Sequence, residues 1–372
     1  MSGCKSLPVL MHHYISRHPN TIAVTPELFR EQCEGLAEAG WKGIRLAEAE
    51  AFLAQGAPLP PRSCLITFDD GYLDNYVYAW PILAEYGHKG TIFAVTERIN
   101  EASQNLPADA PRATLADIRD NTYPEYALPD VDHPDHDTPF GYSERRDQFF
   151  TWTEARRMEE SGVIQVAAHS MRHQSVFIGD NFTSFILPGH PFRTFGRPRD
   201  CCWGIPNFAH KAGLANRAFI PSDELVSAVT SLVPQDDAGA FAFSKTPGHR
   251  QELSALVARM AGKLGRMEND GEMRERLYEE LASGKTIMEK ELGHTVKTLC
   301  WPWGEFSETA LNIGRELGFT VFVTTEYGPN PPGNPLAVRR FKVKQKSASW
   351  LLTRVRIFSH PLLGALYAKC RI

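Results

Sequence analysis

The sequence predicts an α/β fold in which parallel strands alternate with helices around one chemical site. Short apolar runs typical of buried strands are separated by stretches with a helical period, as in residues 64–68, the helix that follows them, and residues 90–95. Four or five of these runs end directly in chemically reactive residues. Because the carboxyl ends of parallel strands meet at one edge, this repetition predicts a single active site on one face of a barrel.

The composition is that of an ordinary globular protein. The 372 residues are 42% hydrophobic and 23% charged, with a net charge of -4, which argues against a nucleic-acid partner. No apolar run approaches the roughly 20 residues that span a bilayer. Seven cysteines without a CxxC pair favour reduced thiols. The first ten residues lack a secretory apolar core, so we expect a cytoplasmic location, with a position at the membrane periphery as the alternative.

The first strands predict the first half of the site. Residues 7–11 form an apolar run that leads into His12 and His13. Residues 64–68 form a second run, which ends in Asp69, Asp70 and Gly71. Adjacent carboxylates raise each other's pKa and therefore favour a nearby cation, metal or proton. Taken alone, an Asp-Asp-Gly turn of purely structural meaning explains this stretch equally well.

Helices are expected between these strands. Thr25 and Pro26 begin one helix, as a capping hydroxyl followed by proline at the first helical position, and Gly40 ends it. Another runs through Trp80 to Gly87, with Pro81 as a kink or a start. Residues 101–148 show no period and are interpreted as an irregular insertion loop.

The second half of the site follows the strand at residues 163–168. This strand leads into His169-Ser170-Met171-Arg172-His173, whose two histidines share one face if the segment turns helically. An HxxxH pair is a common way to present two imidazoles to one metal ion. By itself the pair is moderate evidence, and its position at a strand end strengthens it.

The remainder contains a second insertion and the last strands. Residues 174–284 are interpreted as an insertion subdomain, and residues 272–292 as a long amphipathic helix. The strand at residues 296–300 meets the turn Trp301-Pro302-Trp303-Gly304. Strands at residues 320–325 and 337–343 follow, the latter with Arg339 and Arg340. Residues 346–372 are expected to form a tail helix that covers the barrel or, through residues 350–372, contacts a membrane surface.

Brought together, these strand ends form a centre for hydrolysis. One carboxylate and two imidazoles make a three-ligand metal site with open positions, which activates water near neutral pH. The second carboxylate is then available as general base, and spacing does not tell which aspartate has which role. Backbone N–H groups of residues 301–304 could stabilise an oxyanion, and a further histidine could protonate the leaving amine. The chemistry is hydrolysis of an amide or ester.

The motifs Thr67-Phe68-Asp69-Asp70-Gly71, His169-Ser170-x-x-His173 and Trp301-Pro302-Trp303-Gly304 resemble those of carbohydrate esterase family 4, the polysaccharide deacetylases with the NodB-homology domain. The resemblance implies a single deacetylase domain over residues 1–372, folded as a distorted (β/α)7-type barrel with two large insertions. Its core would be residues 7–100, 149–175 and 285–345. It also implies an enzyme that removes acetyl groups from N-acetylated sugars with a divalent metal, most often Zn²⁺, with Co²⁺, Ni²⁺, Mn²⁺ or Fe²⁺ as alternatives.

Residue roles come with this resemblance. Asp69 is the expected general base, and Asp70, His169 and His173 are the expected metal ligands. The Trp303 amide is the expected oxyanion donor. The expected substrate-binding residues are Trp301, Pro302, Tyr72 and Arg340.

Two departures from the family pattern bear on these roles. Cys300 stands where many members have an arginine that steadies the base, and Arg340 or Arg339 is the candidate replacement. A late Leu-x-His motif that supplies the acid is missing, and His360 is a poor match. The Leu-Met-His-His13-Tyr opening instead resembles the poly-N-acetylglucosamine deacetylase branch, in which an N-terminal histidine serves as the general acid in place of the late histidine. His13 aligns with that histidine.

Two other functions remain open at this stage. A non-catalytic glycan-binding protein on the same fold is consistent with the missing arginine and late histidine. An O-acetyl esterase or deformylase acting on a lipid-linked sugar would use the same centre. In every case the expected partner is an N-acetylated glycan or glycan precursor.

Overall fold

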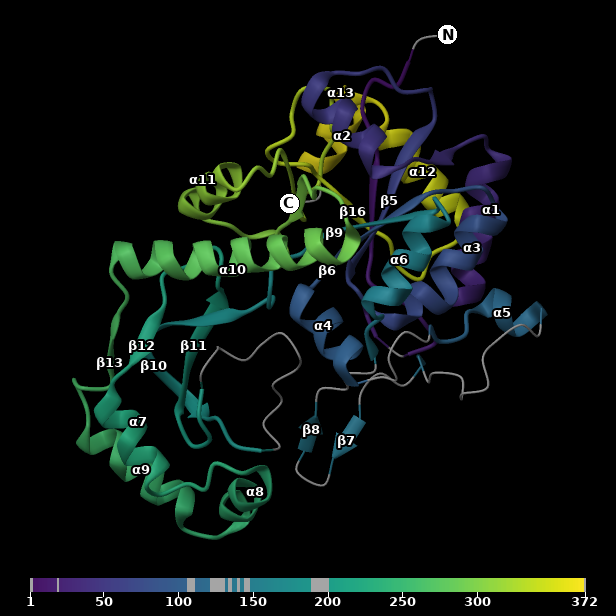
Figure 1. Cartoon of the computed structure of the whole chain (residues 1–372). Coiled ribbons are helices and arrows are strands. Elements are labelled where there is room, and N and C mark those ends of the chain that lie inside the picture. Colours follow the sequence, from purple (N-terminus) through teal and green to yellow (C-terminus); the bar gives the residue numbers. More distant parts are fainter. Residues whose placement is uncertain are drawn as a thin grey trace.

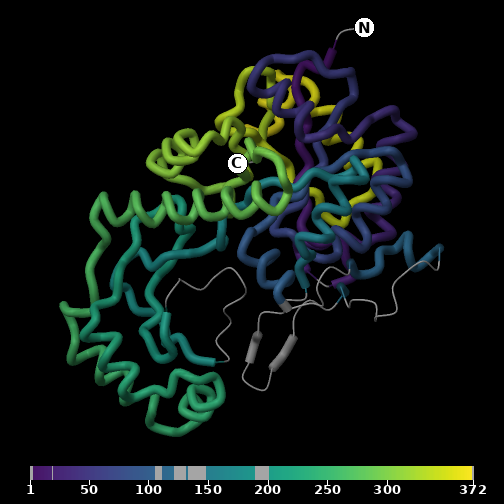
Figure 2. Tube along the Cα trace, in the orientation of Figure 1, coloured from purple at the N-terminus to yellow at the C-terminus, as the bar shows by residue number. Residues whose placement is uncertain are grey.

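The structure is a computed structural model of the whole chain. It describes residues 3–18, 20–105, 111–120, 131–132, 136–138, 141–143, 148–188 and 201–370. Two bodies are connected by one long helix (Figures 1 and 2). The larger body contains both ends of the described chain, and the smaller body is built from residues 175–267.

The larger body is organised around a curled parallel sheet. Along the sheet the strands are β15 (Val321–Val323), β14 (Thr298–Cys300), β9 (Ile164–Ala168), β6 (Gly90–Ala94), β5 (Ser63–Asp70), β1 (Val9–His12) and β16 (Phe341–Lys342). β4 (Lys42–Gly43) also pairs with β5. A single bridge from Val323 to Val338 connects β15 to the segment that leads into β16, so the sheet closes on itself. The predicted distorted barrel is confirmed.

The strand register aligns the reactive residues. Asp70 pairs with Ala94, Ala94 pairs with Ala168, and Ala168 pairs with Leu299. The residues that follow these positions therefore leave the sheet at one edge. This register explains how Asp70, His169 and the turn at residue 301 come together although they are far apart in sequence.

Helices cover the outside of the barrel. They are α1 (Pro26–Glu38), α2 (Leu46–Gln55), α3 (Trp80–Glu85), α4 (Thr96–Asn105), α6 (Trp152–Glu160), α10 (Asp270–Leu292) and α11 (Glu308–Glu316). α1 begins as predicted, because the Thr25 side chain accepts a hydrogen bond from the Leu28 N–H and Pro26 follows it. Pro81 lies in the first turn of α3, so the prediction that it marks a helix start is confirmed. A π-helical turn, η1 (Asn75–Ala79), precedes α3, so the helix changes its hydrogen-bonding pattern just before the proline.

The first insertion is only partly described. It contains α5 (Leu115–Asp120) and a small hairpin of β7 (His136–Thr138) and β8 (Gly141–Ser143). Much of residues 101–148 lies outside the described part of the chain.

The second insertion forms the smaller body and has its own core. It consists of the hairpin β10 (Ser175–Phe185) and β11 (Pro206–Ala212), the pair β12 (Phe219–Pro221) and β13 (Gly265–Met267), and helices α7 (Asp223–Thr230), α8 (Asp237–Lys245) and α9 (His249–Arg259). Phe177, Phe208, Leu225 and Leu253 are buried in a cluster separate from the barrel core. α10 follows this body and packs against α11 and β9 of the barrel, which makes it the connection between the two (Figure 1).

The C-terminal tail forms two helices where one was expected. α12 (Ala348–Phe358) packs against α1, and α13 (Pro361–Lys369) begins after His360, because proline is favoured at the first helical position. Leu362, Leu363 and Leu366 of α13 are exposed. Among the described helices, none combines the length and the apolar character that crossing a membrane requires.

Candidate active site

A cavity of about 480 Å³ opens at the carboxyl edge of the barrel strands. Seven residues that were predicted from the sequence line it: His13, Asp69, Asp70, Tyr72, His169, His173 and Trp303. The strands bring these side chains to one place, as the convergence of strand ends predicts. The other lining residues are Met11, Tyr14, Asn20, Ile22, Gln148, Thr325 and Lys342.

Asp70, His169 and His173 form a group suited to one metal ion. Asp70 Oδ1 lies 3.5 Å from His169 Nε2 and 3.7 Å from His173 Nε2. Two ligands about 2.1 Å from one tetrahedral ion are about 3.4 Å apart, so these separations match a shared ion. Asp70 Oδ1 is buried and has no hydrogen-bond partner among the described residues. The three side chains therefore fit a divalent metal.

The backbone around this group is held in an uncommon conformation. Among described residues other than glycine, five have a positive φ, and four of these are at the site. They are Asp70 (78°), Ser170 (64°), His173 (51°) and Trp303 (55°). Such conformations are costly and persist where the surrounding structure imposes them, often at functional sites. Here they turn two metal-ligand candidates toward each other.

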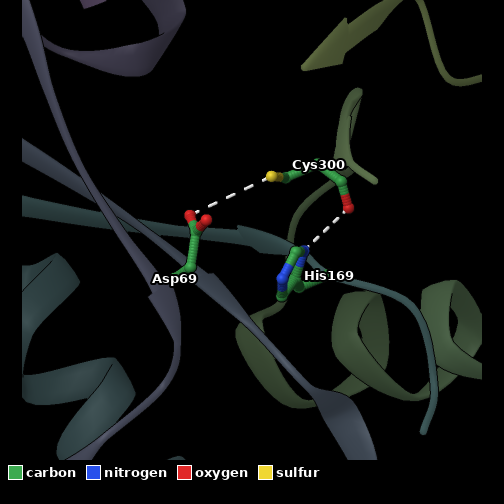
Figure 3. A group of neighbouring side chains, drawn as sticks. All are labelled: Asp69, His169 and Cys300. Atoms are coloured by element: carbon green, nitrogen blue, oxygen red, sulfur yellow. Dashed lines mark hydrogen bonds between the residues drawn. The ribbon is translucent and has the colours of Figure 1, made fainter. Parts of the chain in front are cut away.

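Cys300 orients His169 through its backbone. The His169 Nδ1 atom lies 2.8 Å from the Cys300 carbonyl oxygen and donates to it, so Nε2 is left to face the cavity (Figure 3). Asp69, His169 and Cys300 also lie close enough to form an alternative metal group. However, both Asp69 oxygens are already engaged, and burial raises the pKa of the Cys300 thiol and keeps it protonated. The group at Asp70 is therefore the better metal centre.

Asp69 is clamped by Arg340, which reaches it from the last strand. Arg340 NH1 donates to Asp69 Oδ1 at 2.6 Å, and NH2 donates to Oδ2 at 2.8 Å. NH2 also lies 3.1 Å from Cys300 Sγ. The guanidinium thus occupies the space beside Cys300, where the family arginine was missing. Arg340, not Arg339, is the replacement.

The electrostatics assign different states to the charged groups. Burial raises the pKa of Asp69, but Arg340 and the neighbouring histidines outweigh this and hold its pKa below the usual value. Asp70 behaves alike, because His169 and His173 outweigh its burial and lower its pKa. Burial lowers the pKa of His173 to about 3, so its imidazole is neutral at pH 7, the form that binds metals. Both aspartates are carboxylates at neutral pH.

His13 lines the same cavity, beside Asp69. Its Nε2 atom is 3.9 Å from Asp69 Oδ2, and the Asn75 side chain donates to its backbone carbonyl at 2.9 Å. Burial is the main cause of a lowered His13 pKa, which Asp69 partly opposes. His12, in contrast, points into the core between Phe68 and Phe29, which agrees with a structural role.

The Trp-Pro-Trp-Gly turn divides into buried and exposed residues. Trp303 is 40% exposed and packs edge-on against His173, with ring centroids 4.2 Å apart. Trp301 is fully buried and stacks on Phe306 and Phe322, and Pro302 is also buried. The assignment of Trp301 and Pro302 as substrate-binding residues is corrected: they form the base of the turn. The oxyanion role of the Trp303 amide stays a prediction.

Tyr72 and Arg340, the other two expected substrate-binding residues, lie in different surroundings. Tyr72 lines the cavity and stacks on Tyr14, with centroids 3.8 Å apart. Arg340 has no exposed side-chain surface, so its assignment to the substrate is corrected to a contact with Asp69. Sequence reasoning missed Lys342, which belongs to the short strand β16 and lines the cavity.

Comparisons with known proteins agree with this geometry. Residues 56–184 match the family model described as polysaccharide deacetylase. A putative polysaccharide deacetylase YxkH of Bacillus subtilis is 40% identical over 93 residues, which are 25% of this chain and 33% of that protein. The poly-β-1,6-N-acetyl-D-glucosamine N-deacetylase of Escherichia coli K12 is 25% identical over 174 residues, 47% of this chain and 21% of that protein. The chain thus aligns with a third or less of these relatives.

Solved structures show the same fold. The BpsB deacetylase domain of Bordetella bronchiseptica has a TM-score of 0.55 at 20% identity, over 92% of this chain and 97% of that chain. A de-N-acetylase from Aggregatibacter actinomycetemcomitans has a TM-score of 0.57 at 16% identity, over 94% and 99%. These structures show the likeness of the fold, and residues 56–184 match the polysaccharide deacetylase family that the motifs predicted.

Proposed function

We propose that the protein is a metal-dependent hydrolase that removes N-acetyl groups from an N-acetylated sugar of a polysaccharide or glycan precursor. One observation carries the proposal. A three-ligand group of Asp70, His169 and His173 lies beside a clamped free carboxylate, Asp69, in one cavity. The printed function of the Escherichia coli relative supports an N-acetylglucosamine polymer as substrate class.

Asp70, His169 and His173 would hold the metal. A divalent ion bound there supplies a Lewis acid for the acetyl carbonyl and lowers the pKa of water. Asp69 is the group that takes up the proton of the attacking water, and the Arg340 clamp keeps it ionised and fixed in direction. His13, whose Nε2 atom lies 3.9 Å from Asp69 Oδ2, is the residue to which we assign proton donation to the leaving amine. Trp303 and Tyr72 form walls for the sugar.

The arginine found in the structure weakens the alternative of a non-catalytic glycan-binding protein. That alternative depended largely on the missing arginine, and Arg340 supplies a guanidinium to Asp69 from another strand. The geometry does not by itself select N-acetyl over O-acetyl substrates, so the assay includes both.

Acetate release from N-acetylglucosamine oligosaccharides tests the proposal. We expect release to require a divalent metal, to stop with chelator and to fall by about 10²–10⁴-fold in Asp69→Asn, because the general base is lost. Asp223→Asn, an exposed carboxylate on α7, is the matched control and should keep full activity. Undiminished release after chelation or in Asp69→Asn would overturn the mechanism. Release from O-acetylated sugars alone would overturn the N-deacetylase assignment.

A further inference from the structure

Lys342 is a cavity residue to which the mechanism above gives no role. It lies on β16, directly opposite Met11 of β1 in the parallel register, and both side chains line the cavity. Arg340, two residues earlier, reaches Asp69 inside the barrel. Lys342 lines the cavity, so its side chain also lies on the inner side of the barrel.

The charge of Lys342 is not neutralised by the protein. Within the described residues, its ammonium group makes no hydrogen bond and no ion pair with a carboxylate. The carboxylates that line the cavity have other neighbours, since Asp69 faces Arg340 and Asp70 faces the two imidazoles.

Partial burial of Lys342 makes its charged form costly, because the ammonium group loses water without gaining an anion. Lys342 is half-buried, and burial lowers its pKa, with a smaller contribution from Lys344. Removing an ammonium group from water without a compensating anion disfavours its charged form. An anion entering the cavity would recover that cost.

We propose that Lys342 forms a subsite for an anionic substituent, a carboxylate or a phosphate, on the N-acetylated glycan or on the sugar next to the deacetylated one. The inference rests on the proposed function and narrows its substrate class. A charge-assisted hydrogen bond from the ammonium group would orient the sugar with its acetyl group toward Asp69 and the metal-ligand group. The same cavity would accept a neutral sugar with a weaker interaction at this end.

Kinetics on matched substrates test the subsite. Acetate release is measured with three acceptors: a neutral N-acetylglucosamine oligosaccharide, the same oligosaccharide with a neighbouring uronic acid, and a phosphorylated N-acetylglucosamine. We expect wild type to prefer an anionic acceptor by about tenfold or more in kcat/KM, the size of one hydrogen bond to a charged group. Lys342→Met should abolish this preference through KM, and Lys342→Arg should retain it. The two anionic acceptors distinguish carboxylate from phosphate.

Lys344→Met is the matched control, because Lys344 is exposed and does not line the cavity. It should leave the preference unchanged. An equal loss in Lys342→Met on all three acceptors, or no anionic preference in wild type, would overturn the subsite. If wild type releases no acetate from any acceptor, the proposed function fails instead. Calorimetric titration of the uronic acid oligosaccharide into wild type and Lys342→Met then still decides the subsite: wild type should bind it about tenfold or more tightly than the variant, and equal dissociation constants would overturn the subsite.

Discussion

Arg340 and Asp69 are separated by 271 positions in the chain and joined by two hydrogen bonds in the barrel. Both side chains are buried, with 0% and 4% of their surface exposed. A buried ion pair costs desolvation energy to form, and breaking it by removing one partner costs more, because the remaining charge has no counterion. The clamp therefore supports the fold as well as the direction of the general base.

Arg340→Met should lower the free energy of unfolding by about 3–5 kcal/mol, because the Asp69 carboxylate is left buried and unpaired. Urea denaturation followed by circular dichroism measures this change. The neighbouring Arg339→Met is the control. Arg339 pairs with Glu326 at the surface, where loss of an ion pair costs about 1 kcal/mol or less.

The double variant Arg340→Met/Asp69→Asn should recover part of the lost stability, since it removes the unpaired charge. A double variant as unstable as Arg340→Met, or equal effects of Arg340→Met and Arg339→Met, would contradict the clamp.

At the level of elements, α10 supports the turn that carries the metal-ligand histidines. Glu280 of α10 accepts hydrogen bonds from the Arg172 backbone N–H at 2.6 Å and from its guanidinium at 3.0 Å. Gly284 lets the helix approach closely, because a Cβ there would lie 3.1 Å from the Met171 backbone nitrogen. Glu280 thus holds the backbone between His169 and His173 from outside the site.

Glu280→Gln should weaken metal binding by about 10-fold or more while the protein stays folded, as for other groups that orient metal ligands. Competition of the apoprotein with a chromogenic chelator measures the dissociation constant, and circular dichroism checks the fold. Glu279→Gln is the matched control. Glu279 is half-exposed, and its contact with the Arg172 guanidinium is longer, at 3.5 Å. Equal metal affinity in wild type and Glu280→Gln would show that α10 does not position the ligands.

The sequence predicted those parts of the site that lie within one motif. Asp69 with Asp70, and His169 with His173, are local pairs at strand ends, so apolar runs and spacing were enough to find them. Trp301 and Trp303 could not be told apart, because the positive φ of Trp303 decides which ring leaves the core. Arg340 was named only as one of two candidates beside Arg339, and Lys342 was missed, because the short strand β16 leaves too brief a pattern to show which side chains face the cavity.

On the scale of the whole molecule, two separate cores share α10 as their connection. The barrel core and the cluster around Phe208 and Leu225 have no buried residue in common. An insertion subdomain was predicted over residues 174–284, but its strands and the residues of its core were not, because the apolar residues are spread over short elements without a sustained period. The tail was expected as one helix, although Pro361 in fact signals the break.

The predicted contact of the tail with a membrane belongs to this scale and stays a prediction. Leu362 and Leu366 of α13 are 77% and 62% exposed. If α13 lies on a bilayer, wild type should co-sediment with vesicles containing phosphatidylglycerol, and the variant Leu362→Ser/Leu366→Ser should not. A matched variant, Leu336→Ser, changes an exposed leucine outside the tail. Equal sedimentation of all three proteins would contradict the contact.

The clamp on Asp69 also has a consequence for biosynthesis. During translation the aspartates and both histidines leave the ribosome well before Arg340, which comes later in the chain. Until the segment of Arg340 and β16 pairs with β1, the barrel is open and the Asp69 carboxylate has no counterion. A chain that ends before Arg340 would keep every proposed metal ligand but lack the counterion of Asp69, so we expect it to be inactive.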